Sequence, residues 1–265
     1  MSTKTHPILD YPGDGPAMIE PSRLYAKRER IPRRCVLCFF ADVLKNRQDT
    51  GELQPIAMLP GEGEPIRIFQ QVDQDDSDDE GVSVAFPGIG APFAASTLEE
   101  MIALGGEAFL CVGGAGVLDG AIPVGRIMIP TAALRDEGTS YHYQRRGRWS
   151  RPEPKVIDAI REVCDERGLE TSSIRTWTTD GVYRETPEKI ALRRGEGCSA
   201  VEMEAAAFFA VADFRGVALG QVLYAGDDVS GDRWEHRDWI TQVKTRETLF
   251  EIALEAVRRV PLNSR

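Results

Sequence analysis

Two carboxylates that flank a methionine are the residues of this sequence best placed to do chemistry. Glu202, Met203 and Glu204 begin an Ala-rich helix predicted at 202–214. Carboxylates at a helix start face the positive end of the helix dipole. Small residues before them and bulky apolar residues after them predict burial, where unpaired carboxylates are strongly destabilising. The pair is therefore expected to bind a polyol or a cation. An ordinary helix start with an acidic first turn is the alternative.

A single aspartate, Asp227, is the candidate for acid catalysis. It follows an apolar strand predicted at 217–224 and stands beside small residues. A carboxyl at such a strand end can be held partly desolvated, in the form that donates a proton near neutral pH. An Asx turn over residues 224–232 accounts for the same residues equally well.

Glycines follow another predicted strand, at 108–112. Gly113 and Gly114 carry no side chains, so a ligand could approach the backbone there and use its N–H groups. Glycine pairs of this kind are equally common in ordinary turns. In α/β sheets ligands collect where strands end, and all three candidate segments fit that position.

Strands and helices alternate from residue 87 onward, which predicts an α/β sheet with helices on its faces. The apolar run at 34–40 has no alternation and predicts a strand covered on both faces, with a helix start at 41–48. No internal repeat and no linker divides the chain. Further strands are predicted at 53–59, 65–72, 82–86, 124–130 and 172–177, and further helices at 92–104, 153–167, 187–194 and 238–259.

The composition limits the classes of function. Among 265 residues, 42 acidic side chains outnumber 32 basic ones, and the net charge of −10 argues against nucleic-acid binding. No apolar stretch reaches the roughly 20 residues of a membrane span, and the N-terminus lacks the apolar run of a signal peptide. A cytoplasmic protein without a membrane partner is expected. Five scattered cysteines predict free thiols rather than disulfides or a metal site.

The N-terminal residues 1–30 are expected to form an arm and a helix outside the main domain, which spans 31–265. The arm is predicted to lie over the surface or over a neighbouring subunit. The basic run at 23–34 is interpreted as a solvated helix and the segment that leads into the first strand, with an anion site as the alternative. Six carboxylates at 73–80 lack the glycine and final glutamate of a calcium loop, so they predict a solvated hairpin tip.

The candidate segments, in this order and at these intervals, resemble the nucleoside phosphorylase family. This family includes purine nucleoside phosphorylases, uridine phosphorylases and the methylthioadenosine/S-adenosylhomocysteine nucleosidases. The resemblance covers roughly residues 80–255 and implies one three-layer α/β domain. Its central β-sheet would be mixed, partly barrel-like and flanked by helices, and the domain would cleave the bond between a base and ribose C1′. The motifs are GIGAP at 88–92, FLCVGGAGVL at 109–118, IPVGRI at 122–127, RDEGTSYH at 135–142, VEMEAAA at 201–207 and GDDVSG at 226–231.

The resemblance implies roles for the candidate residues. Glu204 would accept hydrogen bonds from the 2′- and 3′-hydroxyls of the ribose, with Met203 packing on the sugar and Glu202 beside it. Asp227 would protonate the leaving base at N7 with help from Arg246. Because uridine phosphorylases lack this aspartate, a purine or purine-like nucleoside is favoured.

The resemblance places further residues around the nucleoside. Trp177 or Tyr183 would stack on the base, unless both are plain core residues. His6 is similar to a histidine that a neighbouring subunit supplies to the 5′ end, and a homo-oligomer (dimer, trimer or hexamer) is expected. Neither a metal nor an organic cofactor is expected, because phosphate or water is the co-substrate. The glycines on the side of the nucleophile are Gly90, Gly113 and Gly114.

The sequence departs from the phosphorolytic members at the phosphate site. It lacks their Pro-Gly-Asp turn and arginine after the first strand, and Cys111 and Gly114 replace a second arginine and a Ser or Thr. A phosphate site without cations binds weakly. Hydrolytic members also lack these arginines and use a carboxylate to activate water. Asp42 could take that role, although it could equally cap a helix.

Hydrolysis is therefore favoured over phosphorolysis, which would give ribose 1-phosphate. In the phosphorolytic alternative, the basic run at 23–34 or Arg67 of a neighbouring subunit would restore the phosphate site. A catalytically silent nucleoside-binding module is a third possibility. Asp227 together with Arg246 argues against it, because binding alone needs no proton donor.

Overall fold

One continuous β-sheet organises the chain, which the computed structural model describes at residues 6–11, 13–61, 63–72 and 81–262. Its strands are β1 (Arg34–Cys38), β2 (Leu53–Leu59), β3 (Ile66–Gln71), β4 (Val82–Ala85), β5 (Ala108–Val117), β6 (Ile127–Asp136), β7 (Trp149–Ser150), β8 (Thr171–Thr179), β9 (Ala200–Glu202) and β10 (Ala218–Asp228). They are arranged in the order β10-β6-β8-β9-β5-β1-β4-β3-β2, with β7 paired to β6. Because β10 pairs with β5 as well as with β6, five strands close into a mixed barrel.

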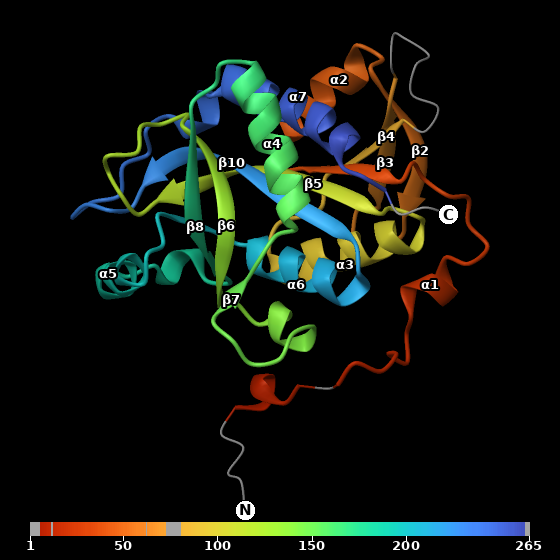
Figure 1. Cartoon of the computed structure of the whole chain (residues 1–265), viewed down its shortest axis with the longest axis horizontal. Coiled ribbons are helices and arrows are strands. Elements are labelled where there is room, and N and C mark those ends of the chain that lie inside the picture. Colours follow the sequence, from red (N-terminus) through yellow and green to blue (C-terminus); the bar gives the residue numbers. More distant parts are fainter. Residues whose placement is uncertain (1–5, 12, 62, 73–80, 263–265) are drawn as a thin grey trace, which may run out of the picture.

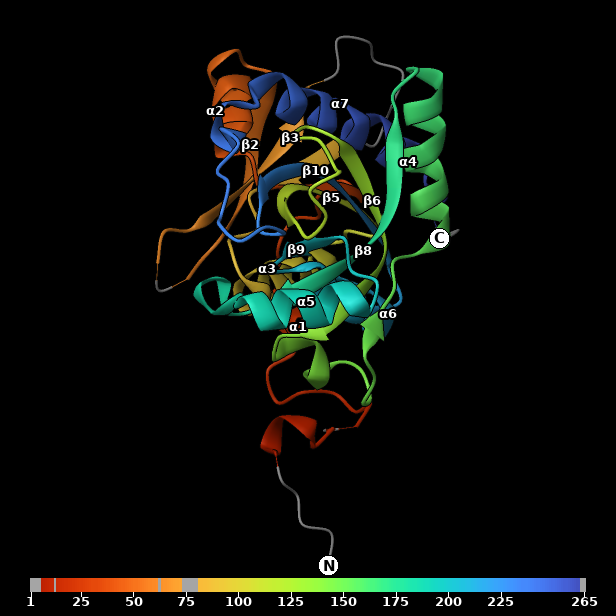
Figure 2. The ribbon, with the colours of Figure 1, turned by 90° about the vertical axis from the view of Figure 1, so that its left-hand side faces the viewer.

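Helices cover both faces of this sheet. They are α1 (Pro21–Leu24), α2 (Ala41–Asp49), α3 (Ala91–Ala103), α4 (Pro154–Glu166), α5 (Pro187–Gly195), α6 (Ala205–Arg215) and α7 (Val243–Arg259). α4 packs against α7 on one face, and α3 packs against α6 on the other (Figure 1). A view turned by 90° shows α7 above the barrel strands and α3 below them (Figure 2). The single three-layer α/β domain expected from the resemblance is confirmed.

The local sequence explains the elements nearest the barrel opening. β1 runs parallel to β4 on one side and to β5 on the other, and four of its five residues are buried, as its unbroken apolar run predicts. α2 follows at once and carries Asp42 in its first turn. α6 ends at Gly216, whose φ of +68° gives the left-handed cap that glycine favours.

The N-terminal arm lies along the lower edge of the molecule in Figure 1. Its regular parts are a 3₁₀ helix, η1 (Pro7–Leu9), and α1. Arg146 donates to the backbone carbonyl of Leu9 at 3.0 Å, and the Arg145 guanidinium lies 5.2 Å from the centroid of the Tyr11 ring. The arm therefore lies over a surface of its own chain, next to the segment that joins β6 to β7.

Some element boundaries differ from those that the sequence predicts. Gly113 and Gly114 lie inside β5, which continues to Val117, and not in a loop after residue 112. α6 begins at Ala205 and not at residue 202, because the preceding residues form β9, a strand too short for its pattern to predict. β7 is missed for the same reason. The acidic turn at 73–80 lies outside the described residues.

All five cysteines are buried free thiols, as the sequence predicts. Within the described ranges, none of the helices is both long enough and apolar enough to cross a membrane.

The close approach of β10 to α4 generates a test of the packing. A Cβ at Gly220 would lie 2.6 Å from Val156 Cγ1, too close for any real contact. Gly220→Ala is therefore expected to lower the free energy of unfolding, measured by urea denaturation, by about 1–3 kcal/mol. Gly195→Ala is the matched control, because a Cβ at Gly195 meets nothing within 4 Å and alanine favours helix. Equal stability of the two variants would contradict this packing.

Candidate active site

A cavity of about 670 Å³ opens at the end of the barrel. The parallel strands β1, β5 and β10 end at the same edge of the sheet, so the residues that complete or follow them share one space. The loop between β9 and α6 and the first turns of α2 and α7 close its sides. The residues predicted from the sequence that line the cavity are Asp42, Gly113, Gly114, Glu202, Met203, Glu204, Asp227 and Arg246.

The carboxyl of Glu202 is hydrogen-bonded to other groups of the protein. Its Oε2 accepts from the backbone N–H groups of Glu204 and Ala205 at 2.7 and 2.6 Å, and its Oε1 accepts from the hydroxyls of Thr178 at 2.6 Å and Thr176 at 3.3 Å. Burial raises the pKa of the Glu202 carboxyl, and these donors oppose the shift. The sequence predicts sugar contact here, whereas the structure makes Glu202 the residue that joins β8, β9 and the start of α6.

Glu204 is the carboxyl of this segment that the cavity makes available. Its Oε1 accepts from the backbone N–H of Gly90 at 2.6 Å. Gly90 is the N-cap of α3, with a φ of +91°, so its N–H points away from the helix and toward Glu204. Burial, followed by the charge of Glu202, raises the pKa of Glu204 to about 8. Gly90 therefore supports the sugar-side carboxylate from outside the cavity lining.

Asp227 meets a partner different from the one expected. Its Oδ2 accepts from the indole N–H of Trp234 at 2.7 Å. Arg246, which the resemblance places beside Asp227, instead donates to Asp42 Oδ2 at 3.0 Å and to the Tyr224 hydroxyl at 3.3 Å. Arg246 therefore forms an ion pair with Asp42 in this structure, and its assistance of Asp227 stays a prediction.

Glu185 is the cavity residue that sequence reasoning missed. It lines the cavity just before α5, and burial, followed by the charge of Asp227, raises its pKa to about 7, with Lys189 opposing the shift. The sequence signal for Glu185 is its place in the segment after β8, two residues beyond the aromatic candidate Tyr183.

The two aromatic candidates lie outside the cavity. Trp177 is completely buried in β8 and donates through its indole N–H to Asp136 at 2.9 Å, so it cannot stack on a base. Tyr183 is 95% exposed and is not part of the lining. His6 is exposed on the arm, away from the lining residues, so its contact to a neighbouring subunit stays a prediction.

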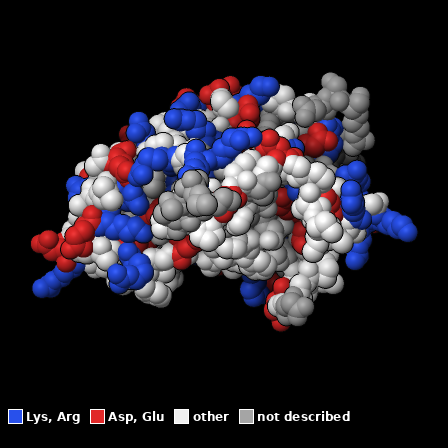
Figure 3. All heavy atoms as spheres, turned by 90° about the horizontal axis from the view of Figure 1, so that it is seen from below, with Lys and Arg blue, Asp and Glu red and all other residues white. Residues whose placement is uncertain are grey.

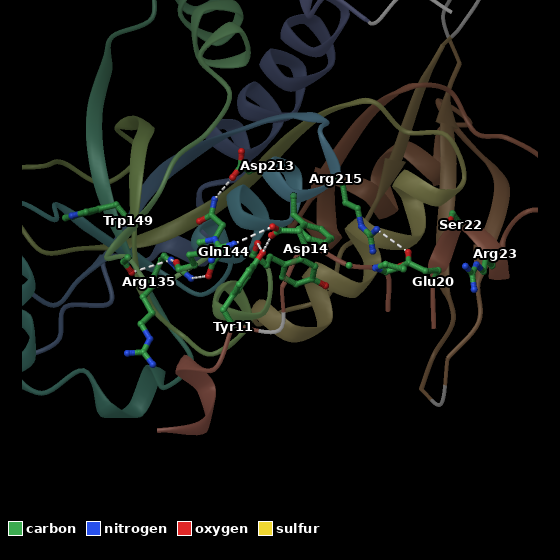
Figure 4. Close-up of a pocket in the computed structure, with 17 residues that line it drawn as sticks. Tyr11, Asp14, Glu20, Ser22, Arg23, Arg135, Gln144, Trp149, Asp213 and Arg215 are labelled. Atoms are coloured by element: carbon green, nitrogen blue, oxygen red, sulfur yellow. Dashed lines mark hydrogen bonds and ion pairs between the residues drawn. The ribbon is translucent and has the colours of Figure 1, made fainter. Parts of the chain in front are cut away.

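A larger cavity, of about 950 Å³, lies between the arm and the segment after β6 (Figure 4). Several of its charged groups are held by other groups of the protein. Arg215 pairs with Glu20 at 3.2 Å, Tyr11 donates to Asp14 at 2.5 Å, and Arg135 donates to backbone carbonyls of Arg145 and Gln144. Acidic and basic side chains are interspersed on the face seen from below (Figure 3). The candidate catalytic residues Asp42, Asp227 and Arg246 line the barrel cavity and not this one.

The charge of the barrel cavity is strongly one-sided. Among the described residues that line it, Arg246 is the sole cation, and its charge is matched by Asp42. No group of three or more His, Cys, Asp and Glu side chains in the described ranges could hold a metal ion. The carboxyl-bearing residues of the lining are Asp42, Glu185, Glu202, Glu204 and Asp227.

Comparison with known proteins defines the class. A family model described as "Phosphorylase superfamily" matches residues 73–258, and the chain belongs to this family. This match confirms the prediction from the sequence motifs that the chain is an enzyme of the nucleoside phosphorylase family.

The individual relatives have low sequence identity to this chain, but the matches cover most of each protein. The chain is 28% identical to the guanosine phosphorylase of Halorubrum lacusprofundi over 203 residues, which is 70% of this chain and 83% of that protein. It is also 28% identical to the uridine phosphorylase of Treponema pallidum, over 67% of this chain and 72% of that protein. Among solved structures, a purine nucleoside phosphorylase from Toxoplasma gondii has a TM-score of 0.74 at 20% identity, covering 86% and 90% of the two chains. An AMP nucleosidase from Bacteroides thetaiotaomicron has a TM-score of 0.69 at 20% identity, covering 86% and 88%.

The contrast between the two glutamates gives a stability prediction. Glu202→Ala leaves two buried backbone N–H groups without their acceptor and is expected to lower the free energy of unfolding by about 3 kcal/mol. Glu204→Ala removes the acceptor of one N–H and is expected to cost about 1 kcal/mol. Urea denaturation of both variants measures the difference. Equal losses would show that Glu202 does not hold the junction.

Glu185 gives a prediction about pH. Its pKa is about 7 in the folded chain and 4.5 at its ordinary value, so the wild type loses stability as pH rises from about 4.5 through 7. Glu185→Gln does not ionise, and it is expected to match the wild type at pH 4 and to unfold at a higher temperature at pH 8. The control is Glu188→Gln, whose exposed carboxyl has a lowered pKa and should give no gain at pH 8. A pH-independent difference between Glu185→Gln and wild type would contradict this assignment.

Proposed function

We propose that this protein hydrolyses the N-glycosidic bond of a purine or purine-like nucleoside and releases the free base and ribose. The charge of the cavity carries the proposal: its lining has five carboxyl-bearing residues and one arginine that is already paired. A phosphate dianion finds no unpaired cation among these residues. Water carries no charge and needs no such partner.

The same surplus of carboxylates favours the transition state. Breaking the bond builds positive charge on the ribose, and this charge favours the ionised form of Glu204. Glu204 then accepts from the sugar hydroxyls and stabilises the positive charge. Met203 lines the cavity beside it and supplies an apolar surface for the sugar. Glu202 acts indirectly, by holding both residues in place.

The leaving base must also take up a proton. Asp227 donates it, and a proton supplied in this way accelerates such reactions by about 10²–10⁴-fold. Glu185 also lines the cavity, and burial, followed by the charge of Asp227, raises the pKa of Glu185 to about 7. A purine presents N7 as the acceptor, which is why a purine or purine-like base is proposed.

Asp42 is the proposed base that activates water. Arg246 holds its Oδ2, and the Asp42 side chain is 44% exposed, so water reaches the other oxygen. The Arg246 guanidinium is itself fixed by the Tyr224 hydroxyl and lies over the ring of Phe40. This ion pair orients the carboxylate toward the cavity.

Phosphorolysis is the second candidate, and the curated relatives favour it. The guanosine phosphorylase and the uridine phosphorylase named above are matched over most of their length. In that case the cation that binds phosphate would come from a neighbouring subunit of a homo-oligomer.

The decisive measurement is release of free base from inosine, guanosine, adenosine and uridine in phosphate-free buffer made with H₂¹⁸O. We expect base release with ¹⁸O in the ribose, faster for the purine nucleosides than for uridine. Asp42→Asn is expected to lower kcat by about 100-fold or more, because the water loses its base.

Asp49→Asn is the control, since Asp49 ends the same helix and pairs only with Lys45 among the contacts of the described residues. Release that requires phosphate and gives ribose 1-phosphate would establish phosphorolysis. Binding of nucleoside without any release would establish a silent binding module.

A further inference from the structure

The turn after β10 places an aromatic donor against the candidate acid. Asp228 and Glu235 form an antiparallel bridge in which each backbone N–H donates to the carbonyl of the other at 2.9 Å. Residues one step away from such a pair share the opposite face of the ribbon. Asp227 and Trp234 are two of these residues, and the indole N–H of Trp234 donates to Asp227 Oδ2 at 2.7 Å.

Further contacts fix this turn against the barrel. Arg237 forms an ion pair with Asp228 at 2.9 Å and donates to the backbone carbonyl of Ile122 at 2.9 Å. Arg237 and Asp238 both have positive φ, +51° and +47°, which is uncommon for residues with a Cβ. Backbone of this kind persists where surrounding contacts hold it. Trp234 is therefore presented to Asp227 by a defined turn.

The Asp227 carboxyl contacts Trp234 and lies close to β5. Trp234 donates to its Oδ2, and a Cβ at Gly116 of β5 would lie 3.5 Å from Oδ1 and 3.6 Å from Oδ2. Trp234 is 61% exposed, so it adds little to the apolar core. Its one hydrogen bond to a described residue goes to the candidate acid. Trp234 also packs edge-on against His236, with ring centroids 5.4 Å apart, and its polar contact goes to Asp227.

We propose that Trp234 is a positioning residue that anchors Oδ2 of Asp227 and leaves Oδ1 to deliver the proton to the base. The role rests on the proposed function. As the bond from C1′ to the base breaks, its electron pair stays on the base, and the Asp227 proton moves to a base nitrogen. The Asp227 carboxylate that remains is stabilised by the indole N–H, and solvent returns a proton to it after the base leaves.

The proposal has a defined consequence for pH dependence. Glu185, from the segment before α5, and Tyr224, from β10, also interact electrostatically with Asp227. The indole N–H favours the ionised form of Asp227, so removing that N–H favours the protonated form. Because the acid must be protonated to act, loss of the indole moves the alkaline limb of the activity profile to higher pH.

Trp234→Phe keeps an aromatic ring and removes the N–H. We expect kcat at pH 6 to fall about tenfold with little change in KM, because Asp227 loses its anchor while the sugar contacts remain. The alkaline limb of kcat/KM is expected to move up by about one pH unit. Trp149→Phe, which makes the same change outside the cavity lining, is expected to match wild type. An unshifted alkaline limb in Trp234→Phe would overturn the proposal.

A measurement on the resting protein separates this proposal from the proposed function. With ¹⁵N-labelled indoles, the Trp234 Nε1–H resonance is identified among four tryptophans by its loss in Trp234→Phe. It is expected to shift with pH in wild type and to lose that shift in Asp227→Asn. A pH-dependent shift without any base release would support the anchor and reject hydrolysis. A resonance unaffected by Asp227→Asn would reject the anchor even in an active enzyme.

Discussion

The candidate site depends on one buried carboxylate. Glu202 ends β9, and its two oxygens accept from two backbone N–H groups at the start of α6 and from two threonine hydroxyls of β8. A carboxyl group buried to this degree is tolerated because four donors replace the water it has lost. These hydrogen bonds fix the path of the backbone between β9 and α6. Met203 and Glu204 lie on that path, so Glu202 positions their side chains although both of its own oxygens are already hydrogen-bonded.

The second constraint is electrostatic and acts on the whole cavity. Five carboxyl-bearing residues converge there because strands, loop and helix N-termini all end at one opening of the barrel. Burial, followed by the charge of a neighbouring carboxylate, raises the pKa of Glu204 and of Glu185. Positive charge that develops on a sugar favours the ionised form of such carboxyls, and the ionised form stabilises that charge. A phosphate dianion would favour their neutral form instead.

Much of this architecture could be predicted from local sequence. The strands and helices with long apolar runs or clear periodicity lie where their patterns place them, and residues of the motif at 201–207 line the cavity as predicted. Pairings between distant segments could not be predicted. The ion pair of Asp42 with Arg246 joins residues 204 apart in sequence, and the influence of Asp227 on Glu185 arises only when β10 closes the barrel. Trp177 was ambiguous because an aromatic residue in a strand suits a core and a ligand site equally well.

A local irregularity at the end of β10 explains why the two halves of the site meet. Side chains in a regular strand alternate between faces, so Tyr224 and Asp227, three positions apart, would point to opposite sides. The register of β10 against β5 shifts between Ala225 and Asp228, and both side chains line the cavity. A bulge of this kind re-aims the residues that follow it. Tyr224 then holds Arg246 beside Asp42 while Asp227 lines the cavity from the same strand. In the proposed reaction, β10 would therefore support both the activation of water and the protonation of the leaving group.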